Sequence, residues 1–256
     1  MAGNVLVVAF DGMDKELIDK FDLDHVTQDE YGQIDNHTGV KEINTDELFA
    51  SFITGETWEE HGVTGIKEWD SPILNRIEGV FPKRGALFTI GDMAKDGIKR
   101  FGGFERERYT REKIDCPTLF DRIDGSRALN IPAYDVTPGI EVFSWVLDKY
   151  GIEHAEREAR KEFRQRKEEF WAAMDEPASP LFMVHFHYID SINHLYGDVL
   201  HDEEKLEAAY AEMDRFAGEI LDAAEDRYDT IIFMSDHGLP TATEHNENAF
   251  YSSNVE

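Results

Sequence analysis

Three apolar runs in this chain each lead into an aspartate, and this repeated feature limits the fold more than any other. VLVVAF is followed by Asp11, LFMVHFHYI by Asp190, and TIIFM by Ser235 and Asp236. The runs are almost continuously hydrophobic, which is typical of strands buried on both faces of a parallel sheet. We therefore expect three parallel strands, each ending at its aspartate, and a fourth strand at residues 127–131.

Two long segments rich in Glu, Ala, Lys and Arg separate these strands, at residues 150–174 and 202–224. Their apolar residues have helical spacing and their outer faces are charged. Alternating strands and helices predict a three-layer α/β/α fold with a mostly parallel sheet. A chain of 256 residues suits one such domain over residues 1–256. The irregular residues 71–116 are interpreted as an insertion or cap near the site, or alternatively as a solvated loop and helix.

The composition excludes several classes of function. The chain has 54 Asp and Glu against 26 Lys and Arg, which gives a formal net charge of −28. Such a surface repels nucleic-acid backbones, so no nucleic-acid binding is expected. Clear apolar strands in so acidic a chain fit a folded protein that works in high salt, and a halophilic source is our hypothesis. One cysteine, Cys116, no basic leader and no long apolar segment predict a cytoplasmic protein without a membrane span.

The three aspartates should meet in space, because ligands of open α/β sheets bind outside the carboxyl ends of the strands. Taken singly, each aspartate has a plain structural explanation. Asp11 and Gly12 can form an ordinary turn, and an Asp after a strand often caps the next helix. The aspartates therefore need a second signal before they indicate a functional site.

Histidines supply this second signal. DSINH places His194 after Asp190, SDHG places His237 directly after Asp236, and a further histidine, His245, lies in TEHNENAF. Carboxylate and neutral imidazole are the ligands that zinc and similar divalent metals prefer. Six such side chains in loops beyond strands are hard to explain by hydrogen bonding alone, and an anionic cluster is costly without cations. We therefore predict a metal site.

Thr45 begins the segment TDELFASFIT, a predicted helix with Asp46 and Glu47 in its first turn. A helix N-terminus offers N–H groups and the positive end of the helix dipole to an anion. A threonine at this place is also an ordinary N-cap, and without the metal ligands we would favour that explanation. Beside a metal, its hydroxyl can lose a proton near neutral pH and become a nucleophile.

The motifs VVAFDGMD, NTDELFASFITG, HGVTG, IDSINH, MSDHG and EHNENAFYSS follow one another over nearly the whole chain. Each motif is weak alone, but the ordered set resembles the alkaline phosphatase superfamily, and within it the nucleotide pyrophosphatase/phosphodiesterase branch. In that family the nucleophile lies nine residues before the Thr of a Thr-Gly pair, which a His-Gly pair follows. Thr45, Thr54 and His61 match this pattern.

This resemblance implies an alkaline phosphatase-like fold and a two-metal hydrolase of a small-molecule phosphoryl ester, with a phosphodiesterase as the first choice. The two divalent ions are expected to be zinc, with manganese as the alternative, and a phosphothreonine intermediate would form on Thr45. The implied ligands of one metal are Asp190, His194 and His245, and those of the other are Asp11, Asp236, His237 and the Thr45 oxygen. His61 is interpreted as structural, and His185 and His187 as core groups or groups that support metal ligands.

Position 66 bears on the substrate. Nucleotide pyrophosphatases of the family have an Asn 21 residues after the nucleophile that donates to a phosphoryl oxygen, and this chain has Ile66 there. This difference weighs against nucleotide diesters. Lys67, the N–H groups of Thr45 and Asp46, or a basic residue of the 71–116 insertion are alternative donors. The sulfatase motif C/S-x-P-x-R is absent from the chain, so sulfate esters are not expected.

Three alternatives stay open at this point. A phosphomonoesterase or a phosphomutase-like enzyme would use the same core. A non-catalytic metal-binding regulatory protein would keep the ligands without turnover, although a full set of clustered ligands is hard to rationalise without a use. An acidic structural protein that merely collects cations would lack a defined metal geometry.

Overall fold

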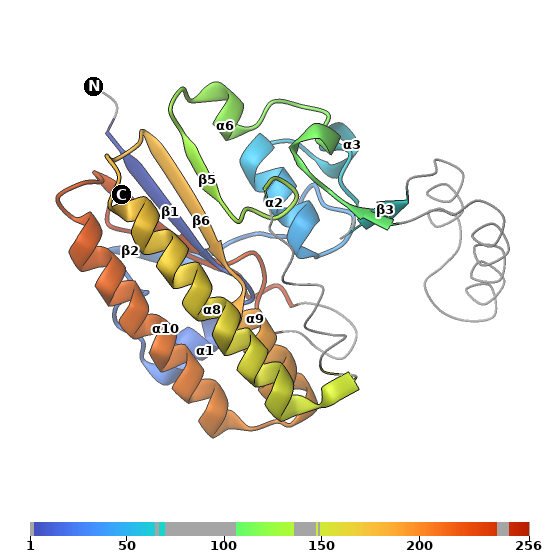
Figure 1. Ribbon diagram of the computed structural model, residues 1–256, viewed down its shortest axis with the longest axis vertical. Helices are drawn as coiled ribbons and strands as arrows, with labels where there is room; N and C mark the ends of the chain where they lie inside the picture. Colours follow the sequence, from blue (N-terminus) through green and yellow to red (C-terminus); the bar gives the residue numbers. More distant parts are fainter. Residues whose placement is uncertain are drawn as a thin grey trace, which may run out of the picture.

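The apolar runs form the centre of a parallel sheet. β1 (Val5–Phe10) lies between β6 (Leu181–Phe186) and β7 (Thr230–Met234), and β5 (Arg127–Leu129) pairs with β6. All these pairings are parallel, so the four predicted strands are confirmed (Figure 1). This computed structural model describes residues 3–64, 67–69, 106–135, 147, 149–239 and 246–255.

Two more strands extend the sheet beyond β7, and the sequence pattern does not predict them. β8 (Phe250–Ser253) pairs antiparallel with β7, and β2 (Glu30–Gln33) pairs antiparallel with β8. The strand order is therefore β2-β8-β7-β1-β6-β5. No residue of β2 is fully buried, and β8 alternates buried and more exposed residues, so neither strand has the continuous apolar run that identifies the central strands.

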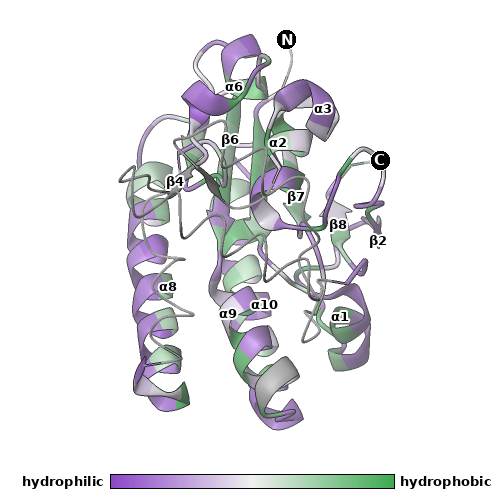
Figure 2. Ribbon diagram, turned by 90° about the vertical axis from the view of Figure 1, so that its right-hand side faces the viewer, coloured by the Kyte–Doolittle hydropathy of each residue, from purple (hydrophilic) through white to green (hydrophobic). Residues whose placement is uncertain are grey.

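Helices cover both faces of this sheet, which confirms the three-layer α/β/α arrangement (Figure 1). One face carries α1 (Lys15–Phe21), α8 (Ile152–Met174), α9 (Tyr188–Ile192) and α10 (Glu203–Ala224). The other carries α2 (Thr45–Thr54), α3 (Trp58–His61) and α6 (Leu119–Arg122). The two long predicted helices are confirmed as α8 and α10, along which hydrophobic and hydrophilic residues alternate (Figure 2).

The core explains why the central runs are continuously apolar. Consecutive side chains of a strand point to opposite faces. In β1, Leu6 and Val8 pack in the cluster that contains α8 and α10, whereas Val7 and Ala9 pack in the cluster that contains α2. Every position of β1 after Val5 is therefore buried, and the loops at its carboxyl end are held between two packed layers.

The predicted insertion at 71–116 lies outside the described residues as far as residue 105. Its described end contains β4 (Arg106–Arg108), which pairs antiparallel with β3 (Lys67–Trp69), and the 3-10 turn η1 (Arg111–Lys113). One basic residue of this stretch, Arg111, pairs with Asp121 at 2.8 Å. Among the helices of the described part of the chain, none has the length and hydrophobicity to cross a bilayer.

Candidate active site

The elements that follow β1, β6 and β7 meet at the carboxyl edge of the sheet. Asp11 follows β1 directly, and Asp236 and His237 lie just beyond β7. Asp190 does not lie at a strand end as predicted, because β6 ends earlier and Asp190 is in the first turn of α9. That prediction was wrong because all residues of α9 are buried, and hydrophobicity alone does not separate a buried strand from a buried helical turn.

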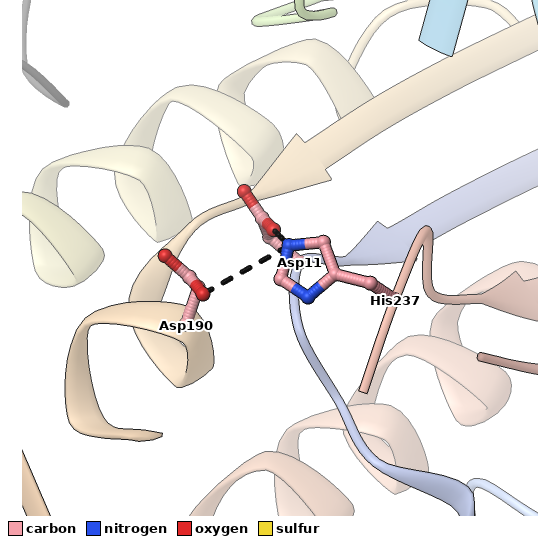
Figure 3. Close-up of side chains that lie close together, drawn as sticks. All are labelled: Asp11, Asp190 and His237. Carbon is pink, nitrogen blue, oxygen red and sulfur yellow. Dashed lines mark ion pairs between the residues drawn. The ribbon is translucent and has the colours of Figure 1, made fainter. Parts of the chain in front are cut away.

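Asp11, Asp190 and His237 point toward one another from these three elements (Figure 3). His237 Nε2 lies 3.2 Å from Asp11 Oδ1 and 3.9 Å from Asp190 Oδ1. Asp236 Oδ2 lies 3.5 Å from the same nitrogen. All four side chains are buried. Ligand atoms of the first three lie within 4.8 Å of one another, a spacing at which one cation can contact several of them.

Three carboxylate oxygens in this cluster are buried and accept no hydrogen bond from the described residues: Asp11 Oδ1, Asp190 Oδ1 and Asp236 Oδ2. An unsatisfied buried acceptor costs about 1–3 kcal/mol, and a charged one costs more. Clustered anions also repel one another. Divalent cations would supply the missing partners and the missing positive charge, so these residues fit a metal centre.

The protonation of the cluster reflects the same crowding. Burial raises the pKa of Asp11, but the positive charge of His187 and hydrogen bonds from imidazoles outweigh it and hold the pKa well below its usual range. Burial and the charge of Asp11 raise the pKa of Asp236 to about 6. Although burial disfavours the charged imidazole, Asp236 and Asp11 raise the pKa of His237 to about 10. The imidazoles therefore hold protons that partly neutralise the carboxylates.

Two imidazoles of the β6 segment fix the orientation of Asp11. His185 Nε2 lies 3.0 Å and His187 Nδ1 lies 2.7 Å from Asp11 Oδ2. Phe49 packs edge-on against the His185 ring, with the ring centroids 5.0 Å apart. Asp11 Oδ2 is thus occupied, while Oδ1 is the oxygen that approaches His237. This is the arrangement expected of groups that orient a metal ligand.

His194 lies at the edge of the cluster, on the π-helix η2 (Asn193–Val199) that continues from α9. Its Nε2 is 3.6 Å from Asp190 Oδ2, and its side chain is 35% exposed, so it can reach a ligand from solvent. Asn193 at the start of this turn donates to the Gly12 carbonyl at 2.6 Å. π-Helical turns are rare and occur mostly at functional sites, which fits the position of His194.

Gly12 allows the loop after β1 to lie against α9. Its φ is +68°, and a Cβ there would lie 3.0 Å from the Asp190 side chain. Its N–H donates to Asp236 Oδ1 at 3.2 Å. The turn of Asp11 and Gly12 is therefore more than an ordinary turn, because it brings the three carboxylates together.

Thr45 approaches the cluster from the opposite helical layer. It is the first residue of α2, and its Oγ1 lies 3.5 Å from His237 Nε2. The N-cap of α2 is Asn44, whose side chain accepts a hydrogen bond from Glu47 N at 3.0 Å. The explanation of Thr45 as an N-cap is therefore wrong. The three-residue spacing from Asn44 to Glu47 was a signal for this cap that the sequence reasoning missed.

His61 lies outside the acidic cluster. Its ring is buried, with Nε2 2.9 Å from Ser51 Oγ and Nδ1 accepting a hydrogen bond from Val63 N at 3.1 Å. These contacts tie the end of α3 to α2, in agreement with the structural role interpreted from the sequence. Burial lowers the pKa of His61. Two predictions, those for His245 and Ile66, lie outside the described residues.

A family model described as type I phosphodiesterase / nucleotide pyrophosphatase matches residues 5–254. Murine ectonucleotide pyrophosphatase/phosphodiesterase 5, solved as an inactive variant in complex with AMP, is a structural neighbour. It matches with a TM-score of 0.53 at 16% identity over 92% of this chain and 57% of that chain. The human protein of the same name matches with a TM-score of 0.52 at 13% identity and the same coverage.

These structural similarities concern the fold, since the sequence identities are low. The chain spans little more than half the length of these two neighbours. No curated protein matches it by sequence. The family model, by contrast, covers nearly the whole chain, from the first residue of β1 to the end of β8. The chain therefore belongs to the type I phosphodiesterase / nucleotide pyrophosphatase family of the alkaline phosphatase superfamily.

Proposed function

We propose that this chain is a two-metal phosphodiesterase that acts through a phosphothreonine intermediate on Thr45. The family consists of phosphodiesterases and nucleotide pyrophosphatases, which supports hydrolysis of a phosphoryl ester. The observation that carries the proposal is the position of Thr45 Oγ1. It lies 3.5 Å from His237 Nε2, next to a cluster in which three carboxylate oxygens accept no hydrogen bond from described residues.

Two divalent ions would occupy this cluster. We assign Asp11, Asp236, His237 and the Thr45 oxygen to one ion, and Asp190, His194 and His245 to the other. Carboxylate and imidazole ligands suit zinc, and manganese is the alternative. When bound, the ions would polarise the phosphoryl oxygens and lower the pKa of a hydroxyl or water.

Thr45 performs the covalent step in this proposal. Its Oγ1 forms a bond to phosphorus while the bond to the leaving alcohol oxygen breaks, and the proton lost by Thr45 balances the proton that the alcohol gains. Water then attacks the phosphothreonine, which releases the phosphoryl product and restores the hydroxyl. Because Thr45 is at the N-terminus of α2, the positive end of the helix dipole lies beside the transferred group.

The substrate class we propose is a small-molecule phosphodiester. The formal net charge of −28 disfavours a polyanionic nucleic acid. A nucleotide ester belongs in the test panel because the murine neighbour was solved with AMP, although Ile66 weighs against nucleotide diesters. Ile66 at the place of the family's asparagine favours diesters whose phosphoryl group needs no donor there.

The test compares the rates at which the metal-loaded protein hydrolyses several chromogenic esters. The substrates are bis-p-nitrophenyl phosphate, p-nitrophenyl phosphate and the p-nitrophenyl ester of thymidine monophosphate, each with zinc or manganese. We expect diester hydrolysis that falls roughly 10³-fold or more in Thr45→Ala and is largely kept in Thr45→Ser, which retains the nucleophilic oxygen.

Other outcomes of this panel support the alternatives. A clear preference for the monoester would favour a phosphomonoesterase or a phosphomutase-like enzyme. Metal binding without turnover of any ester, equal in wild type and Thr45→Ala, would favour the non-catalytic regulatory protein.

A further inference from the structure

Another buried carboxylate, Asp14, lies in the loop after β1, and its oxygens are used differently from those of Asp11, Asp190 and Asp236. Oδ1 accepts hydrogen bonds from Glu16 N at 2.8 Å and Leu17 N at 3.2 Å, as the N-cap of α1. Oδ2 accepts from Leu239 N and Asn246 Nδ2, both at 2.8 Å. Four donors saturate this carboxylate, so it is not available to a metal.

The two donors on Oδ2 come from segments that carry proposed metal ligands. Leu239 lies two residues after His237 in the loop after β7, and Asn246 directly follows His245 in the chain. Asp14 itself belongs to the loop after β1. One carboxylate oxygen therefore joins the loop after β1 to two points, Leu239 and Asn246, of the distant stretch between β7 and β8. Each of these places lies beside a residue assigned to the metal centre.

The contacts of Asp14 with Leu239 and Asn246, called the Asp14 junction below, are tightly packed. Gly238 packs so tightly that a side chain there would overlap both Asp14 Oδ2 and Asn246 Oδ1. Gly238 N donates to the Asn246 carbonyl at 3.3 Å. Asp14 N also donates to the hydroxyl of the buried Tyr210 at 3.0 Å. The loop after β1 is thus fixed to α10 as well as to the other two segments.

We propose that Asp14 is a positioning residue whose bonds to Leu239 and Asn246 set the spacing of the metal ligands and hence the affinity for metal ions. This inference rests on the proposed metal centre. Without Oδ2, the segments after β7 and before β8 lose their shared anchor to the loop after β1. Removing a group that orients metal ligands without binding the metal itself typically lowers metal affinity by about 10–100-fold.

A plain capping role for Asp14 makes a different prediction, and two variants separate the roles. Serine is a good N-cap residue, so Asp14→Ser keeps a cap for α1 but removes the oxygen that binds Leu239 and Asn246. The matched control is Asp202→Ala, because Asp202 is the N-cap of α10 and its side chain accepts from Lys205 N at 3.2 Å. This variant loses a helix cap but keeps the Asp14 junction, that is, the bonds from Leu239 and Asn246 to Asp14.

The experiment measures metal affinity directly. Metal-free wild type, Asp14→Ser, Asn246→Ala and Asp202→Ala are titrated with Zn²⁺ and Mn²⁺ in competition with a chromogenic chelator, and urea unfolding reports their stability. Asp14→Ser should bind at least one ion about 10–100-fold more weakly, and the milder Asn246→Ala should lose affinity in the same direction. Asp202→Ala should keep the wild-type affinity although it is less stable.

Hydrogen exchange provides a second readout in the metal-free protein, where the Leu239 amide should exchange faster in Asp14→Ser than in wild type. Wild-type metal affinity in Asp14→Ser would overturn the inference alone. A wild-type protein that binds neither ion would overturn the proposed function together with it.

Discussion

Replacing Asn44 with alanine should destabilise the protein by about 2–3 kcal/mol, although Asn44 takes no part in the proposed reaction. The loss of the N-cap bond to Glu47 N contributes about 1 kcal/mol. The loss of the bond from Asn44 Nδ2 to Glu47 Oε2, 3.0 Å long, contributes about 1–2 kcal/mol, because the acceptor is a charged group. Glu47 keeps bonds from the N–H groups of Lys41 and Glu42, which limits the loss.

Urea unfolding of the metal-free protein, followed by circular dichroism, measures this change. For a chain of this size, 2–3 kcal/mol corresponds to a fall in the thermal midpoint of roughly 4–12 °C. Asn44→Ser serves as the control, since serine keeps the cap and loses only the bond to the Glu47 carboxylate. It should therefore lose about 1–2 kcal/mol.

Thr45→Ala completes the comparison. It should change the free energy of unfolding by about 0.5 kcal/mol or less, because Asn44 still caps α2 and alanine is favourable in a helix. It should nevertheless remove turnover. A loss of stability in Thr45→Ala as large as that in Asn44→Ala would refute the separation of capping from chemistry on which the role of Thr45 depends.

Three further predictions concern the turn, a buried imidazole and the surface charge. Gly12→Ala should destabilise the protein by about 1–2 kcal/mol, because alanine disfavours the left-handed backbone at this position. It should also weaken Zn²⁺ binding, because the new Cβ meets Asp190. Wild-type Zn²⁺ affinity in a chelator competition would contradict this. Burial lowers the pKa of His61, so the unfolded chain binds a proton first as the pH falls through roughly 6.5. Urea unfolding between pH 7.5 and pH 5 should therefore show stability falling more steeply in wild type than in His61→Gln, and parallel curves would exclude His61 as the cause. The formal net charge of −28 implies self-repulsion that salt screens, so the thermal midpoint should rise between 0.1 M and 1 M KCl. A fall in the midpoint over this range would argue against a salt-adapted surface.

The central strands and the long helices could be predicted because their signals are local. A strand buried on both faces must be apolar at each position, as β1 is, and a helix packed on a sheet must repeat its apolar residues at helical spacing, as α8 does. The positions of Asp11 and Asp236 followed from the ends of such strands. Asp190 was misplaced because the chain stays buried while it changes from strand to helix.

The remaining features depend on contacts between distant segments. β2 and β8 are partly exposed strands that pair at the edge of the sheet, and their short sequences carry no strong signal. The contact of Asn193 with the Gly12 carbonyl joins residues 181 positions apart, which no local pattern reveals. The same holds for the two imidazoles on Asp11 Oδ2, since their shared partner directly follows the neighbouring strand β1.

The number of donors on each carboxylate separates the two uses of aspartate in the loop after β1. Asp11 and Asp14 are both buried and only three residues apart, so neither residue type nor burial distinguishes them. Asp14 receives four N–H donors, which use its accepting capacity within the protein. Asp11 has donors on Oδ2 alone, while its Oδ1 accepts no hydrogen bond from the described residues. The Asp11 Oδ1 atom pairs with the His237 ring at 3.2 Å but accepts no hydrogen bond from the described residues, so it can still bind a cation. This difference favours Asp11 as a metal ligand and Asp14 as a positioning residue.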